Sequence, residues 1–181
     1  MGAALAGAAL LQGVAPIVVS GPVAISYPAG TEVHWVETTE QMRRRCHELF
    51  PSCIGVIGAA APCDFRPVSF SEQKITKPKG GSGVSFLFLE TPDILADLGK
   101  IKQSGQWSVA FALETDNGKH RALEKLKQKC CDFVVLNDPG SINSDEASFQ
   151  VFDAAGGLRK AFIGSKRAFA EELLRLIGEN M

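Results

Sequence analysis

Short apolar runs alternate with helical patterns along almost the whole chain, and this alternation limits the fold more than any other feature. Apolar runs at 16–20, 54–60, 108–113 and 132–136 are typical of strands covered on both faces. Helical patterns at 2–12, 38–50, 91–102 and 118–129 lie between these runs. Strands that alternate with helices predict a three-layer α/β domain with a mostly parallel sheet.

The remaining segments complete this prediction. Residues 33–36 and 84–89 are expected to add strands, and 165–177 a closing helix. Residues 150–152 and 159–163 predict a late antiparallel hairpin across the A-G-G at 155–157. The length of 181 residues suits a single domain over 1–181. We therefore expect a Rossmann-like or ribokinase-like sheet with an antiparallel edge.

Charge and composition exclude several classes of protein. Nineteen basic and 20 acidic residues give a net charge of −1, so nucleic acid is not an expected partner. The first 31 residues carry no charged side chain, but Gly13, Pro16, Gly21 and Pro22 interrupt them. We expect neither a signal peptide nor a membrane span here, but a buried alanine-rich helix followed by a strand.

The thiols and imidazoles form no recognisable framework. Five cysteines, an odd number, include no C-x-x-C pair, and three histidines are scattered. This pattern predicts reduced cytoplasmic thiols and no metal site. Cys63 has no evident histidine base, so a buried inert thiol is favoured over a nucleophile.

Polar residues at the ends of predicted strands are the candidates for chemistry, because ligands of such sheets bind beyond the carboxyl ends of the strands. Small residues at 58–61 precede Asp64, whose carboxylate either accepts hydrogen bonds from a base or caps a turn and pairs with Arg66. Glu114 and Thr115 end another run. They are read either as functional groups or as an ordinary strand end with a cap.

Lysines supply two further candidates. The long polar segment 62–83 contains Lys74, Lys77 and Lys79 and reads either as a mobile flap for phosphate charge or as a solvated loop. Lys125 and Lys129 are four residues apart and share a helical face, so we expect both within about 6 Å of one anion. The alternative is a solvated face that includes Lys127. No P-loop, dinucleotide-binding glycine pattern or G-x-S-x-G occurs in the required context.

Short motifs follow one another in the expected strand and helix contexts. They are V-S-G-P at 19–22, A-A-A-P-C-D-F-R-P at 59–67, K-I-T-K at 74–77, T-P-D-I-L at 91–95, F-A-L-E-T at 111–115, V-L-N-D at 135–138 and S-K at 165–166. Over nearly the whole chain, the set resembles bacterial phosphopantothenoylcysteine synthetase, the second half of the bifunctional coenzyme A biosynthesis flavoprotein.

The resemblance implies particular site residues. The implied nucleotide contacts are Gly58, Ala59, Ala60, Asp64, Lys74, Pro92, Phe111, Lys125 and Lys129. Lys74 is implied to be the catalytic flap lysine, and Asn137 a weaker substrate contact. No metal-ligating residue is implied.

The resemblance also implies a reaction and its partners. The carboxylate of 4′-phosphopantothenate attacks the α-phosphate of CTP, and cysteine then displaces CMP from the acyl-cytidylate. Such a ligase uses Mg²⁺ and lysines to neutralise phosphate charge. The implied protein is a cytoplasmic homodimer whose companion is the flavin-dependent decarboxylase half. We expect no flavin in this chain.

Departures from the family keep a second interpretation open. The family begins with a usually central strand, a G-G-T loop and an I-S-N-x-S-S-G-K segment, and this sequence starts at Met1-Gly2, where that segment ends. Thr76 replaces a lysine, and Leu113 replaces an alanine. We therefore expect an N-terminally truncated domain with little ligase activity by itself. The alternative function is a nucleotide-binding or interaction module without full catalytic activity.

Overall fold

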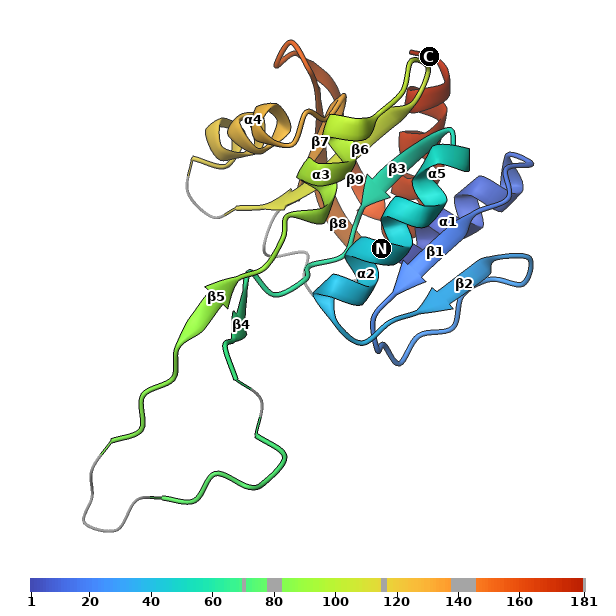
Figure 1. Ribbon diagram of the computed structural model, residues 1–181. Helices are drawn as coiled ribbons and strands as arrows, with labels where there is room; N and C mark the ends of the chain where they lie inside the picture. Colours follow the sequence, from blue (N-terminus) through green and yellow to red (C-terminus); the bar gives the residue numbers. More distant parts are fainter. Residues whose placement is uncertain (70, 78–82, 115–116, 138–145, 181) are drawn as a thin grey trace.

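The computed structural model describes residues 1–69, 71–77, 83–114, 117–137 and 146–180. Figure 1 shows the helices and strands, with two strands in a row after the first helix and three in a row after the 3₁₀ turn. In chain order they are α1 (Gly2–Leu11), β1 (Ile17–Ser20), β2 (Glu32–Trp35), α2 (Thr39–Leu49), the 3₁₀ turn η1 (Phe50–Ser52), β3 (Gly55–Gly58), β4 (Phe65–Pro67), β5 (Phe88–Glu90), α3 (Ile94–Ile101), β6 (Trp107–Leu113), α4 (Gly118–Gln128), β7 (Phe133–Asn137), β8 (Glu146–Asp153), β9 (Leu158–Ser165) and α5 (Lys166–Gly178).

The main sheet has the strand order β3-β6-β7-β8-β9. β3, β6 and β7 run parallel, and β8 and β9 add an antiparallel hairpin at one edge. β1 and β2 form a separate parallel pair. The α/β class, the mostly parallel sheet and the late hairpin are thus confirmed, although the hairpin strands are longer than the sequence predicts.

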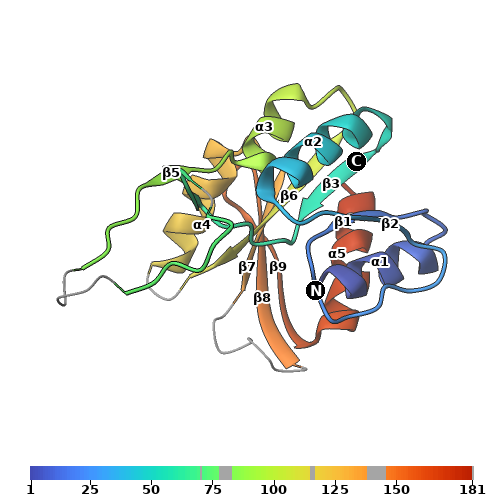
Figure 2. The same cartoon turned by 60° about the horizontal axis from the view of Figure 1, so that its bottom comes forward.

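Helices cover both faces of the main sheet, as Figure 2 shows. α1 and α5 pack on one face, where a core cluster includes Leu5, Val109, Phe149, Phe169 and Leu173. α3 and α4 lie on the other face, where Ala110, Ala112, Ala122 and Leu126 form a second cluster with Leu95 against it. Successive residues of a strand point to opposite faces, which is why neighbouring residues of β6 belong to different clusters.

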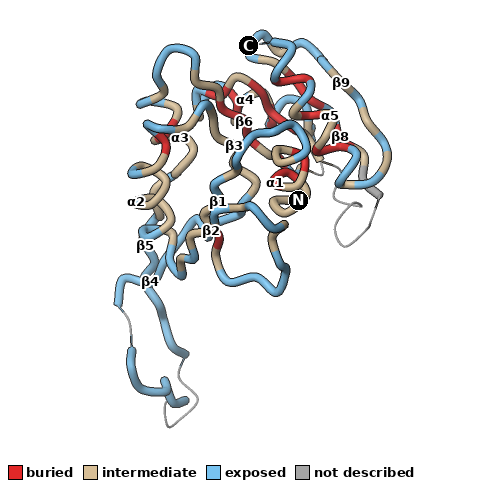
Figure 3. The backbone as a smooth tube through the Cα atoms, turned by 90° about the vertical axis from the view of Figure 1, so that its right-hand side faces the viewer, coloured by how far each residue is buried: buried red, intermediate tan, exposed pale blue. Residues whose placement is uncertain are grey.

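The predicted strand at 84–89 is wrong in position and in role. Only Phe88–Glu90 is a strand, and it pairs antiparallel with β4 instead of joining the main sheet. Figures 1 and 3 show β4 and β5 at the base of an arm that leaves the body of the molecule and is exposed along its described length. An apolar run of this length is compatible with burial, but here no layer of the fold covers it.

The start of the third helix also differs from the prediction. Asp93, two residues after Thr91, is the N-cap of α3, and its Oδ1 accepts a hydrogen bond from Ala96 N at 3.0 Å. Thr91 instead donates its hydroxyl to the Cys63 carbonyl, and its backbone N–H donates to Asp64 O at 2.9 Å. These two hydrogen bonds join the two sides of the arm at its base. The Thr91 hydroxyl is therefore not available to cap α3.

Candidate functional site

The carboxyl ends of three parallel strands lie next to one another at one edge of the main sheet. Gly58 of β3 pairs with Ala110 of β6, and Leu113 at the end of β6 pairs with Asn137 at the end of β7. The side chains of the predicted site follow these strand ends. This edge is where a sheet of this class binds its ligands.

Gly58 has a structural reason to be glycine. A Cβ atom at this position would lie 2.8 Å from Cδ2 of Leu95 on α3. The glycine therefore lets α3 approach the end of β3. After it, Ala59 N donates to Ile57 O at 3.1 Å in a tight turn, and Ala60 is exposed.

Asp64 lies on the way from β3 to the arm. Its carbonyl accepts the hydrogen bond from Thr91 N, so its backbone is held against the residue that precedes Pro92. Asp64 itself is exposed, and Pro92 is half-buried between β5 and the start of α3. Asp64 and Pro92 thus lie on neighbouring backbone segments at the base of the arm.

Lys125 lies on α4 and reaches back to the end of β6. Its Nζ lies 2.6 Å from Oε1 of Glu114. Arg121, one turn earlier on α4, places Nη1 3.4 Å from Oε2 of the same carboxylate. The hydrogen bond from Lys125 and the added charge of Arg121 outweigh the desolvation of Glu114 and hold the pKa of this carboxyl below its ordinary value.

Lys129 follows α4 and bonds a different carboxylate. Its Nζ lies 2.8 Å from Oδ2 of Asp93. Burial raises the pKa of Asp93, but hydrogen bonds from Lys129 and Ala96 N outweigh burial and leave that pKa below its ordinary value. A Cβ atom on Gly99 would lie 2.1 Å from Lys129 O, so α3 and the end of α4 touch through their backbones.

The two lysines bond different carboxylates, and the expectation that both lie near one bound anion stays a prediction. Lys125 is paired with Glu114 and Lys129 with Asp93. One carboxylate belongs to Glu114, which follows β6, and the other to Asp93, which precedes α3. Each lysine therefore has its own carboxylate counterion, which reduces the repulsion between the two like charges on this helical face.

Phe111 lies on the opposite face from these lysines. Its half-buried side chain packs against the core cluster beneath α1 and α5, together with Ile57 and Ala59. Ala110 and Ala112, its neighbours on β6, face α4 instead. The side chains of Phe111 and Lys125 thus reach the strand ends from different sides of the sheet.

Asn137 carries an unsatisfied polar atom at the same edge. Its Oδ1 is buried and accepts no hydrogen bond in the described part of the chain. Buried polar side-chain atoms nearly always have a partner, so this oxygen calls for a donor such as a water or a ligand group. The residues that follow, 138–145, lie outside the described residues.

The surroundings of Lys74 differ from those of the side chains at the strand ends. It is exposed in the extended part of the arm between β4 and β5. The same segment includes Lys77, whereas Lys79 lies outside the described residues. The structure therefore places Lys74 on a projecting segment, as a flap requires, and not against the strand ends.

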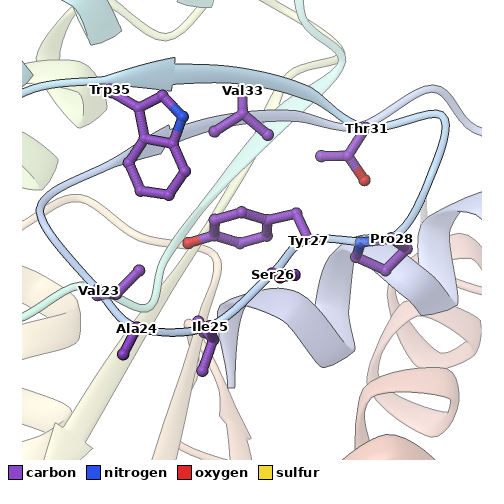
Figure 4. Close-up of a pocket in the computed structure, with 9 residues that line it drawn as sticks. All are labelled: Val23, Ala24, Ile25, Ser26, Tyr27, Pro28, Thr31, Val33 and Trp35. Atoms are coloured by element: carbon purple, nitrogen blue, oxygen red, sulfur yellow. The ribbon is translucent and has the colours of Figure 1, made fainter.

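Open hollows also occur away from these lysine pairs, and one at the start of α4 is lined by Asn117, Gly118, Lys119, His120 and Leu123. Figure 4 shows an open hollow of about 450 Å³ beside β2, in which Tyr27 and Trp35 form a tilted ring pair. Its lining is uncharged: Val23, Ala24, Ile25, Ser26, Tyr27, Pro28, Thr31, Val33 and Trp35. No group of three or more metal-ligating side chains occurs among the described residues. No helix described here is long and apolar enough to cross a bilayer.

The sequence pattern of a known family matches the whole chain. The pattern of the DNA/pantothenate metabolism flavoprotein C-terminal domain matches residues 1–181. The chain belongs to this family. The resemblance drawn from the short motifs is thereby confirmed.

Relatives of this flavoprotein C-terminal domain are longer than the chain. It is 36% identical over 184 residues to a prokaryotic protein named cysteine/cysteine sulfinic acid decarboxylase, covering 98% of the chain and 50% of the relative. It is 32% identical over 182 residues to the coenzyme A biosynthesis bifunctional protein CoaBC of Haemophilus influenzae, covering 99% and 45%. The chain thus spans about half the length of these relatives.

A solved structure supports the same fold. The crystal structure of the C-terminal domain of a coenzyme A biosynthesis bifunctional protein CoaBC matches with a TM-score of 0.82 and 27% identity. The match covers 98% of this chain and 80% of that one. The flavoprotein C-terminal domain described here therefore shares both sequence and architecture with that domain.

Sequence reasoning missed the pairing of these carboxylates with the lysines. The sequence offers Glu114 as a candidate functional group but does not indicate its lysine partner, and it does not single out Asp93 or Arg121. Asp93 lies within the T-P-D-I-L motif, so the motif itself was a signal. The contact between Arg121 and Glu114 carries no such signal, because it depends on how α4 packs against β6.

Proposed function

We propose that this domain catalyses the joining of 4′-phosphopantothenate to cysteine in coenzyme A biosynthesis, with CTP as the activating nucleotide. The substrate carboxylate attacks the α-phosphate of CTP, and pyrophosphate leaves. The amine of cysteine then attacks the acyl-cytidylate and displaces CMP. Membership in the family and likeness to CoaBC support this assignment.

The cation cluster at the strand ends is the structural observation that carries the proposal. Lys125 and Arg121 contact Glu114 directly after β6, and Lys129 contacts Asp93 at the start of α3. Three cations against two carboxylates leave a net positive charge on these side chains. Charge of this kind stabilises a triphosphate and the pyrophosphate that departs from it.

Mg²⁺ fits this site as a companion of the nucleotide. The carboxylates that could hold it, Glu114 and Asp93, are each paired with a lysine. Mg²⁺ is commonly bound through substrate phosphates with few protein ligands. When bound it would neutralise phosphate charge, and the lysines of this chain would contact the remaining phosphate oxygens.

Asp64 is the proposed basis for a preference for CTP over ATP. An exposed carboxylate accepts hydrogen bonds only, and the cytosine amino group is a donor. Calorimetric titration with both nucleotides tests this, with Asp64→Ala as the variant. We expect tighter binding of CTP, and loss of the preference in the variant. Equal or tighter binding of ATP by the unmodified protein would remove the CTP assignment.

Lys74 is proposed to contribute through movement of the arm toward the nucleotide. Lys74→Ala is then expected to reduce release of CMP in the presence of cysteine, with the fold unchanged. Lys119→Ala, which removes a lysine from the start of α4, is the charge-matched control. Unchanged turnover in Lys74→Ala would remove this lysine from the mechanism.

Homodimerisation through the arm is part of the same proposal. Large apolar side chains are exposed along it: Phe65, Val68, Ile75, Val84, Phe86, Leu87, Phe88 and Leu89. Soluble monomers rarely expose so many apolar groups on one segment. A second copy of the chain is the proposed cover for this segment.

A nucleotide-binding module without turnover is the second candidate. Residues 71–77, which include Lys74, belong to the arm that leaves the body of the molecule, and this favours the alternative. Pyrophosphate release with 4′-phosphopantothenate, CTP and Mg²⁺ separates the two. CTP binding without release of pyrophosphate would establish the binding module. Release of pyrophosphate, followed by release of CMP once cysteine is added, would establish the ligase.

A further inference from the structure

Glu114 occupies an unusual position for a carboxylate. It directly follows β6, and only 9% of its side chain is exposed. A Cβ atom on Gly118, at the start of α4, would lie 3.5 Å from Glu114 Cβ, so the backbone of α4 closes over it. The strand end and the helix together hold this carboxylate in place.

The two oxygens of Glu114 bond two different cations. Oε1 lies 2.6 Å from Lys125 Nζ, and Oε2 lies 3.4 Å from Arg121 Nη1. Arg121 and Lys125 are one helical turn apart on α4 and would repel each other without a shared counterion. The carboxylate therefore joins two like charges into one cluster at the end of β6.

In this cluster, Lys125 uses only part of its own hydrogen-bonding capacity. A lysine ammonium has three N–H donors on a flexible four-carbon stem. One donor on Glu114 fixes the direction of the stem and leaves the other two for a ligand. Two cations against one carboxylate also leave one positive charge, so an anion is still attracted.

We propose that Glu114 is a positioning residue that holds Lys125, with Arg121 beside it, in the direction of a nucleotide phosphate. This inference rests on the proposed function, because it assumes that Lys125 contacts the triphosphate. Glu114 itself is too enclosed by the strand end and α4 to leave when the ligand arrives. It acts through Lys125 and not through contact with the nucleotide.

A double-mutant cycle tests the proposal by calorimetric titration with CTP and Mg²⁺. Glu114→Gln removes the charge that holds Lys125, and we expect CTP to bind roughly tenfold more weakly, as for coupled neighbours. In the Lys125→Ala background the same substitution should change CTP affinity less than about twofold. A general loss of structure would weaken binding equally in both backgrounds, so the coupling separates positioning from folding.

Controls keep each outcome decisive. Lys127→Ala removes an exposed lysine of the same helix and should leave CTP affinity unchanged. If Glu114→Gln does not fold, Glu114→Asp keeps the charge and shortens its reach, and should weaken CTP binding only when Lys125 is present. Equal losses in both backgrounds, no loss, or tighter binding would overturn the positioning role. Failure of the unmodified protein to bind CTP would overturn the proposed function, and this inference with it.

Discussion

Asp93 Oδ2 lies 2.8 Å from Lys129 Nζ, while the other oxygen of the same carboxylate caps α3 through Ala96 N. One side chain thus caps the start of α3 and also neutralises a candidate phosphate-binding lysine. The link also joins α3 to the end of α4, whose backbones touch at Gly99 and Lys129. Substitutions at Asp93 should therefore change the stability of the fold through the cap of α3 and change ligand binding through Lys129.

Replacing Asp93 separates its two roles. Asp93→Ala removes the cap, and we expect the free energy of unfolding to fall by about 1 kcal/mol in urea titrations. Asp93→Asn keeps a capping oxygen, so its loss should be much smaller. Both variants release Lys129 from its carboxylate. Equal destabilisation by the two substitutions would contradict a capping role.

Gly99 is predicted to be intolerant of any side chain. The Cβ atom of Gly99→Ala would lie 2.1 Å from Lys129 O, and the backbone must shift to accommodate it. This overpacking should cost about 1–3 kcal/mol, more than the helix gains from alanine. Gly178→Ala is the control, because nothing lies within 4 Å of a Cβ there. Thermal unfolding of both variants measures the difference, and equal Tm values would show that α3 moves freely.

Glu172 should make stability depend on acid. Hydrogen bonds from Arg175 and Lys160 lower its pKa from 4.5 to about 2. A carboxylate with a depressed folded-state pKa stabilises the fold above its unfolded pKa and loses this effect as the pH falls through the folded value. Glu172→Gln should therefore cost up to about 1 kcal/mol at pH 7.

The stability difference between the two proteins should shrink between pH 4.5 and about 2, the span between these pKa values. Urea unfolding at several pH values measures it. Glu171→Gln, which removes a more exposed partner of Arg167, serves as the control. A difference that stays constant with pH would show that the ion pair is not its source.

The arm should determine self-association. Leu87 is 72% exposed on it, and Leu87→Asp should shift the protein from dimer to monomer in light scattering coupled to size exclusion. Ile163→Asp changes a residue that is 81% exposed on β9, away from the arm, and should leave the mass unchanged. A monomeric unmodified protein, or a dimer that survives Leu87→Asp, would exclude the arm as the interface.

Local patterns predicted the elements that obey local rules. The helices predicted at 38–50 and 165–177 are confirmed, and the structure shows a capping box of Thr38 and Gln41 at the start of one and a Ser165 cap at the start of the other. The hairpin across 155–157 is confirmed because β8 and β9 are neighbours in both sequence and space. The strand predicted at 84–89 failed because apolar composition indicates an extended chain but not what covers it.

By itself, the sequence determined the order of strands and helices, the edge at which the strand ends gather, and the family of the chain. These follow from periodicity and from motifs confined to short segments. Only the tertiary structure decided that Lys125 meets Glu114, that Lys129 meets Asp93 and that Phe111 faces α1 and α5. Helical spacing fixes which residues share a face, but the partner of that face depends on how distant elements pack. Charge pairing between such elements is therefore set by the fold and not by the local pattern.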